Sequence, residues 1–196
     1  MKLRAIVIVL TSLALGTAAI AAEASPAPFS IGFGVGVPYD LPIDWTRSFS
    51  YLTAEAFLSQ NLTAVLDLGT YPPDFPNLFE GTASMLVKAW VGPVNAFAGG
   101  GFTLQARHVG TAWGFNPYLT LKGGFQIWVI DSLAIVAQFR THEPIPIHWT
   151  FAPEFSLGIT VALGTGRPDP LVYDLTTLWL VVGLGVAALV AFLPKQ

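Results

Sequence analysis

Large apolar residues alternate with small or polar ones along residues 149–164, W-T-F-A-P-E-F-S-L-G-I-T-V-A-L-G. Pro153 is the only interruption of the apolar series, and Glu154 belongs to the polar series. Because consecutive side chains of a β-strand point to opposite faces, the pattern predicts one long strand with an apolar face and a small or polar face. The stretch is longer than an ordinary strand of about 5–6 residues, and it reaches the roughly 9–11 residues that a tilted strand needs to cross a bilayer.

The same alternation recurs in seven further segments, which we expect to be strands: 29–37, 50–58, 62–69, 81–91, 94–107, 116–130 and 133–140. The connections between strands are long and short in turn. The long ones are 38–49, 70–80, 108–115 and 141–148, and the short ones are 59–61, 92–93 and 131–132. In an antiparallel order all long connections lie at one end, which is the asymmetry of transmembrane β-barrels.

Charged residues within these segments all have the parity opposite to the large aliphatic residues. They are Glu55, Asp67, Lys88, Arg107, Lys122, Arg140 and Glu154. An eight-stranded barrel is just wide enough for side chains to fill its interior, so we expect these charges to pack and pair in the lumen. The opposite parity would then face lipid, and we expect this for Leu66, Phe125, Ile135 and Phe155. A soluble barrel would have apolar residues inside and several charges per strand outside, and here each strand has about one.

The composition agrees with lipid contact. Charged residues make up 11% of the chain, hydrophobic residues make up 53%, and the mean hydropathy is +0.61. The chain has no cysteine, so it offers no disulfide, thiol nucleophile or thiolate metal site. A net charge of −3 gives no reason to expect nucleic acid as a partner.

The first 22 residues have the features of a secretory signal peptide. Lys2 and Arg4 precede an apolar run, 5–15, and small residues follow, with Ala19-Ile20-Ala21 as the best match to a cleavage site. A retained anchor helix is the alternative. The predicted mature chain is exported.

With these features, residues 29–164 resemble the small eight-stranded outer-membrane β-barrel proteins. The resemblance implies an all-β, antiparallel, up-and-down transmembrane barrel in the outer membrane of a two-membrane bacterium, inserted by the barrel-assembly machinery and surrounded by membrane lipid. Such families include structural anchors, adhesion or invasion proteins, conduits for small hydrophobic molecules and a few lipid-modifying enzymes. No short motif carries the resemblance, so it indicates an architecture and no subfamily.

The C-terminus departs from that pattern, because such barrels usually end on their last strand. Here a linker, 165–174, leads into 175–193, which has 19 residues without a charge and is long enough to span a membrane as a helix. A helix docked on protein or lying at the interface is the alternative. Gly183 and Gly185 lack the G-x-x-x-G spacing, so helix dimerisation is not indicated. The ten-residue linker extends at most about 35 Å, so the helix should share the bilayer of the barrel. If the helix is instead an inner-membrane anchor, the barrel lies outside the cytoplasm at that membrane.

The long connections contain the only candidates for catalysis. His108, His142 and His148 lie on or beside them, near Glu143, Ser48 and Ser50, a set of residue types that a hydrolase could use. No G-x-S-x-G element is present, and the histidine spacings do not indicate a metal site. We therefore expect no catalytic residue, metal or cofactor.

The sequence predicts an outer-membrane barrel with a structural or surface-interaction role. Three alternatives remain: a passive conduit or binder for a small or lipidic molecule, a soluble ligand-binding barrel tethered by the C-terminal helix, and a loop-borne lipid hydrolase.

Overall fold

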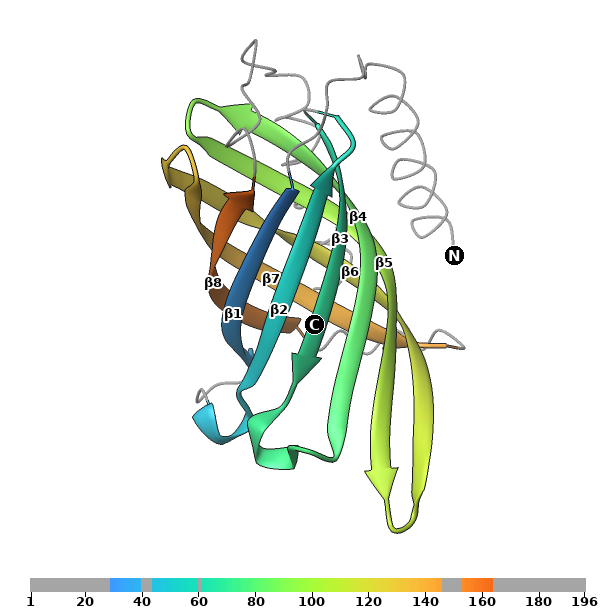
Figure 1. The fold of residues 1–196 in the computed structure, drawn as a ribbon. Coiled ribbons are helices and arrows are strands. Elements are labelled where there is room, and N and C mark those ends of the chain that lie inside the picture. Colours follow the sequence, from blue (N-terminus) through green and yellow to red (C-terminus); the bar gives the residue numbers. More distant parts are fainter. Residues whose placement is uncertain (1–28, 40–43, 60, 146–152, 164–196) are drawn as a thin grey trace, which may run out of the picture.

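The computed structural model describes residues 29–39, 44–59, 61–145 and 153–163, and these form a closed antiparallel barrel (Figure 1). Its strands are β1 (Phe29–Pro38), β2 (Phe49–Phe57), β3 (Leu62–Thr70), β4 (Leu78–Val91), β5 (Val94–Val109), β6 (Ala112–Ile130), β7 (Leu133–Pro144) and β8 (Pro153–Leu163). Two short 3₁₀ turns, η1 (Trp45–Arg47) and η2 (Pro72–Asp74), lie in the connections. Each strand pairs with its neighbours in sequence, and β1 pairs with β8 from Phe29↔Leu163 to Pro38↔Glu154. The predicted eight-stranded up-and-down barrel is confirmed.

The predicted signal peptide (1–22), linker (165–174) and C-terminal helix (175–193) lie outside the described residues. Within the part that the structure describes, no helix has the length and apolar character needed to cross a membrane.

The two ends of the barrel differ. At the short-turn end, β2–β3, β4–β5 and β6–β7 are joined by tight turns, and β1 begins and β8 ends there. At the opposite end, here called the loop end, the prediction of a long connection over 108–115 is wrong. β5 and β6 continue to Val109 and Ala112 and are joined by only Gly110 and Thr111. Gly110 has φ 66°, which a tight hairpin turn requires and glycine adopts without strain.

The consequence is a long hairpin of β5 and β6 that projects beyond the other strands at the loop end (Figure 1). Its residues alternate as a strand does, and His108 pairs with Trp113 and Ala106 with Phe115. β4 begins three residues before the predicted 81, and β7 extends to Pro144. β8 is described from Pro153, and its predicted first residues, 149–152, lie outside the described part.

Most of the outer face of the barrel is apolar and exposed. Leu66, Phe125, Ile135 and Phe155, the residues expected to face lipid, are 43–56% exposed. Three outward positions near the short-turn end, Val87, Ala89 and Ala96, are exceptions and form a buried cluster.

The inner face of β1 consists of small residues, and this makes room for aromatic rings from β2. A Cβ atom at Gly34 would lie 2.3 Å from Cζ of Tyr51, and one at Gly36 would lie 2.4 Å from Cζ of Phe49. Both rings are buried and lie in space that a larger β1 side chain would occupy.

Two apolar clusters lie in the lumen beside its polar layers. One, near the short-turn end, consists of Phe57, Trp90, Trp128, Ala134 and Ala162, and the other, in the middle, of Val65, Leu86, Phe97 and Val136. The barrel is therefore packed inside.

Replacing Phe125 of β6, which pairs with Ala137 near the middle of β7, with Arg tests the lipid contact of the outer face. We expect the free energy of unfolding in lipid bilayers to fall by about 2–4 kcal/mol, because a charge there would lie near the bilayer midplane. Thr111→Arg, in the exposed hairpin turn, is the matched control and should cost little. Denaturant unfolding in vesicles measures both, and equal stability of the two variants would contradict lipid contact at Phe125.

Candidate functional site: the charged barrel interior

Charged side chains converge inside the barrel, where contact with water is almost absent. Six of the seven charges expected in the lumen are buried there: Glu55, Asp67, Lys88, Lys122, Arg140 and Glu154. Arg107 differs, because it lies on the projecting part of β5, where no barrel wall stands opposite, and it is exposed. Glu80, which the sequence analysis assigned to a connection, is buried in the lumen instead. The described interior thus holds four carboxylates and three basic side chains. The sequence had predicted three carboxylates and four basic side chains.

Near the short-turn end, Lys88 is the centre of a buried hydrogen-bonded group. Its Nζ donates to Glu55 Oε2 at 2.9 Å and to Gln126 Oε1 at 3.0 Å, and lies 4.4 Å from the centroid of the Phe57 ring. Ser30 from β1 donates a further hydrogen bond to Glu55, at 3.1 Å. The group joins β1, β2, β4 and β6 across the lumen.

In the middle of the barrel, Lys122 of β6 forms an ion pair with Asp67 of β3, and both side chains are at most 4% exposed. Beside this pair, the hydroxyl groups of Thr82, Thr103 and Thr120 form a hydrogen-bonded row with O···O distances of 2.6 and 2.5 Å. Such contacts meet the hydrogen-bonding needs of polar groups that have left water.

Towards the loop end, Arg140 lies between two carboxylates. Its Nη1 is 2.5 Å from Glu80 Oε1, its Nε donates to Glu154 Oε2 at 2.6 Å, and its guanidinium carbon lies 4.1 Å from the centroid of the Phe49 ring. The hydroxyl group of Tyr71 is 2.9 Å from Glu154 and 3.2 Å from Glu80. Burial, together with these carboxylates, raises the pKa of Tyr71, which lies in the β3–β4 connection, so its hydroxyl remains a hydrogen-bond donor.

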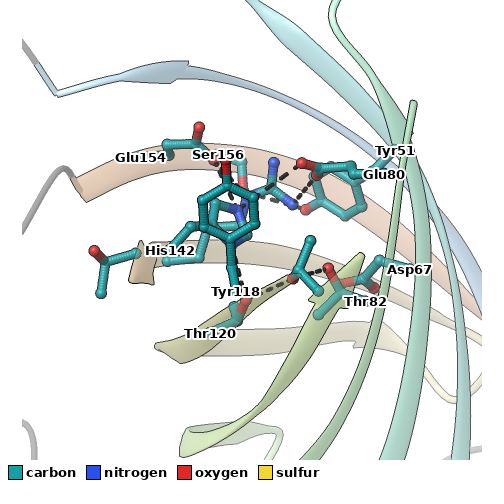
Figure 2. Close-up of polar contacts among 12 residues, drawn as sticks. Tyr51, Asp67, Glu80, Thr82, Tyr118, Thr120, His142, Glu154 and Ser156 are labelled. Carbon is teal, nitrogen blue, oxygen red and sulfur yellow. Dashed lines mark hydrogen bonds and ion pairs between the residues drawn. The ribbon is translucent and has the colours of Figure 1, made fainter. Parts of the chain in front are cut away.

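His142 completes this loop-end cluster, as Figure 2 shows. Its Nδ1 is 2.8 Å from the Thr120 hydroxyl, and its Nε2 is 3.6 Å from Glu154 and 4.0 Å from Glu80. His142 and Glu80 were not predicted to lie in the lumen, because both were assigned to connections between strands. Their parity was the available signal: Glu80 continues the series of Thr82 and Ser84, and His142 continues that of Gln138 and Arg140.

The residues considered for a hydrolase site are dispersed. His142 and Glu143 are consecutive on β7 and therefore point to opposite faces, and Glu143 is buried and accepts a hydrogen bond from Thr141 at 3.4 Å. His108 lies beside Trp113 on the projecting hairpin, with ring centroids 5.0 Å apart. Ser50 lies on the outer face of β2, and Ser48 lies just before that strand. His148 is outside the described residues. The described chain brings no serine, histidine and carboxylate of this set together.

Metal binding is not indicated by the described residues either, since no three His, Asp or Glu side chains among them are arranged to hold an ion.

The interior leaves little free space. A cavity of about 20 Å³ lies beside Tyr51, Asp67, Lys122 and Gln138, which is room for about one water molecule. The buried side chains of the polar layers and the two apolar clusters surround this cavity, so the described interior is a packed core.

No protein family model matches the sequence, and no curated protein is similar to it. Several solved structures have a fold similar to that of this chain. The N-terminal β-barrel domain of Pseudomonas aeruginosa OprF matches 72% of this chain and 100% of its own with a TM-score of 0.54 and 11% identity. A de novo designed transmembrane β-barrel matches 72% of this chain and 99% of its own, with a TM-score of 0.52 and 15% identity. Neisserial surface protein A matches 71% of this chain and 98% of its own, with a TM-score of 0.49 and 15% identity. The fold is that of the small eight-stranded outer-membrane β-barrels, and at this identity the similarity concerns the fold alone.

The ion pair between Lys122 and Asp67 can be tested with one single variant and one double variant. Replacing Lys122 with Met leaves the Asp67 carboxylate buried without its partner, and we expect the free energy of unfolding to fall by about 3–5 kcal/mol. The double variant K122M/D67N also removes the buried charge and should recover most of the loss. Guanidinium unfolding in detergent micelles, followed by tryptophan fluorescence, measures both. A double variant no more stable than K122M would contradict this assignment.

Proposed function

We propose that the chain is an integral outer-membrane β-barrel with a structural or surface-interaction role. One observation carries the proposal: the polarity of the two barrel faces is the reverse of that in a soluble protein. On the outside Leu52 is 60% exposed and Ile159 52%, whereas on the inside Lys122 is 3% exposed and Arg140 0%. Exposing this apolar face to water would be unfavourable, whereas contact with lipid is favourable. The closed barrel also leaves no strand edge without hydrogen-bond partners in the bilayer.

The same observation argues against a soluble tethered barrel, which would place its apolar residues inside. The buried and paired interior side chains argue against a passive conduit, and the cavity of about 20 Å³ beside Lys122 cannot hold a small organic molecule. The dispersed histidines and serines give the hydrolase alternative no support. A structural or surface role remains the best supported.

The orientation of the barrel in the membrane follows from the position of its short turns. β1 begins and β8 ends at the short-turn end, and outer-membrane barrels place their short turns in the periplasm. The loop end then lies at the cell surface. Residues 1–22 serve in this proposal as the signal peptide for export, and the barrel-assembly machinery inserts the barrel.

The part best placed for surface interaction is the projecting hairpin. β5 and β6 have 16 and 19 residues, well above the roughly 9–11 needed to cross the bilayer. Aromatic rings line its outer side and the neighbouring start of β4. The ring centroids of Phe79 and Trp113 are 6.2 Å apart, and those of Trp113 and His108 are 5.0 Å apart. Phe115 is 62% exposed. Aromatic residues are enriched at protein interfaces, so we assign the interaction role to this hairpin.

Ion conductance separates a filled barrel from a conduit. We expect the purified protein to produce no discrete conductance steps in a planar lipid bilayer, because its charged layers and apolar clusters block the lumen. A porin added afterwards to the same bilayer shows that the membrane can report a pore. Reproducible steps from the protein alone would overturn the filled-barrel proposal.

Cysteine labelling tests the orientation, and the absence of native cysteine makes the background clean. Thr111→Cys at the hairpin turn should react in intact cells with a maleimide that cannot cross membranes. Ser132→Cys, in the β6–β7 turn at the short-turn end, should react only after the outer membrane is opened. Labelling of Ser132→Cys but not Thr111→Cys in intact cells would reverse the proposed orientation.

A further inference from the structure

We propose that residues 175–193 form a helix that crosses the bilayer beside its own barrel and packs into a groove on the outer wall over β2–β5. The proposal rests on the membrane-embedded barrel proposed above. It assigns a binding surface on the barrel to the apolar segment that follows the last strand, where barrels of this kind usually end.

The groove is a shallow depression of about 580 Å³ in the lipid-facing wall. Its floor contains small side chains on adjacent strands: Ala56 pairs with Ala64, and the larger Met85 lies between Ala64 and Gly100. A second row runs from Ala54 on β2 through the larger Leu66 on β3 to Ala83 on β4.

Larger residues border this floor. Phe29 lies at its short-turn edge and Phe102 on its β5 side, and they are 61% and 65% exposed. On the opposite wall, by contrast, β7 and β8 present large side chains such as Ile135 and Ile159. Another backbone can therefore come closer to the wall over β2–β5 than to the wall over β7 and β8.

The path of the chain leads to this wall. β8 ends at Leu163, which pairs with Phe29 at the border of the groove. The eleven residues 164–174 can extend roughly 35–40 Å, whereas three strand spacings, from β8 to β3, amount to only about 15 Å. A helix of 19 residues is about 28 Å long, close to the roughly 30 Å of a bilayer core. It can thus run from the short-turn end towards the loop end beside the barrel.

The segment itself has a face suited to close packing. Gly183, Ala187 and Ala191 are spaced by four residues, so on a helix they fall on one side. In lipid no hydrophobic force drives two apolar surfaces together, and close contact between small residues is what stabilises association. Asp174 and Lys195 flank the apolar stretch and would lie at the two membrane surfaces.

Disulfide cross-linking of the full-length protein in native membranes tests the proposal, since the chain has no cysteine of its own. We expect the pairs A83C/A187C and M85C/G183C to form an intramolecular disulfide on mild oxidation, detected by mobility on a non-reducing gel and by mass spectrometry. The pair I135C/A187C places the barrel cysteine on the far wall and is the matched control, which should remain reduced.

Three results would overturn the docking. A cross-link between two chains would make the groove a contact between copies. If the I135C/A187C pair cross-links as efficiently as the groove pairs, or if neither groove pair cross-links, the helix does not dock in the groove and lipid covers it. Each variant is also run with and without boiling. Loss of heat-dependent mobility in the parent protein would instead overturn the membrane barrel on which the docking rests. If one groove pair fails to fold, the other decides.

Discussion

The pairing of β1 with β8 is the constraint on which the rest of the structure depends. Once these strands meet, every strand has two neighbours and the sheet has no free edge. With eight strands, closure also sets the interior width, which is just enough for side chains from opposite walls to touch. The glycines on the inner face of β1 show how tight this is, because the rings of Phe49 and Tyr51 occupy the space that larger side chains would need.

That narrow interior determines how the charges are arranged. A charge removed from water is costly unless it is paired and hydrogen-bonded, and the ammonium groups of Lys88 and Lys122 and the Arg140 guanidinium each contact a carboxylate. Because Arg107 lies outside the lumen and Glu80 lies inside it, the described interior has one more carboxylate than basic side chains. Arg140 accommodates it by contacting Glu80 and Glu154 together, while the Tyr71 hydroxyl lies within hydrogen-bonding distance of both.

A filled lumen moves the question of function to the outer surfaces. The inside holds the barrel together, and the two distinctive features outside the lumen are the projecting hairpin at the loop end and the grooved wall over β2–β5. The proposed interaction role belongs to the hairpin, where aromatic rings lie beyond the length needed to span a bilayer. The proposed helix contact belongs to the groove, where small side chains permit close approach. The two surfaces are independent of each other.

The alternation of residue types determined the strands, their order and their inner and outer faces, because side chains on a strand alternate strictly and each strand here has one apolar face. It was therefore sufficient to assign Glu55, Lys88 and Leu66 to their faces from sequence alone. It failed at strand ends: His108, Glu80 and His142 were assigned to connections because glycine, proline and polar residues nearby resemble loops, although all three continue a strand. Only the tertiary structure decided which charges meet, since Lys122 and Asp67 are 55 residues apart. Such a contact depends on the register of strands and the closure of the barrel, which no local pattern contains.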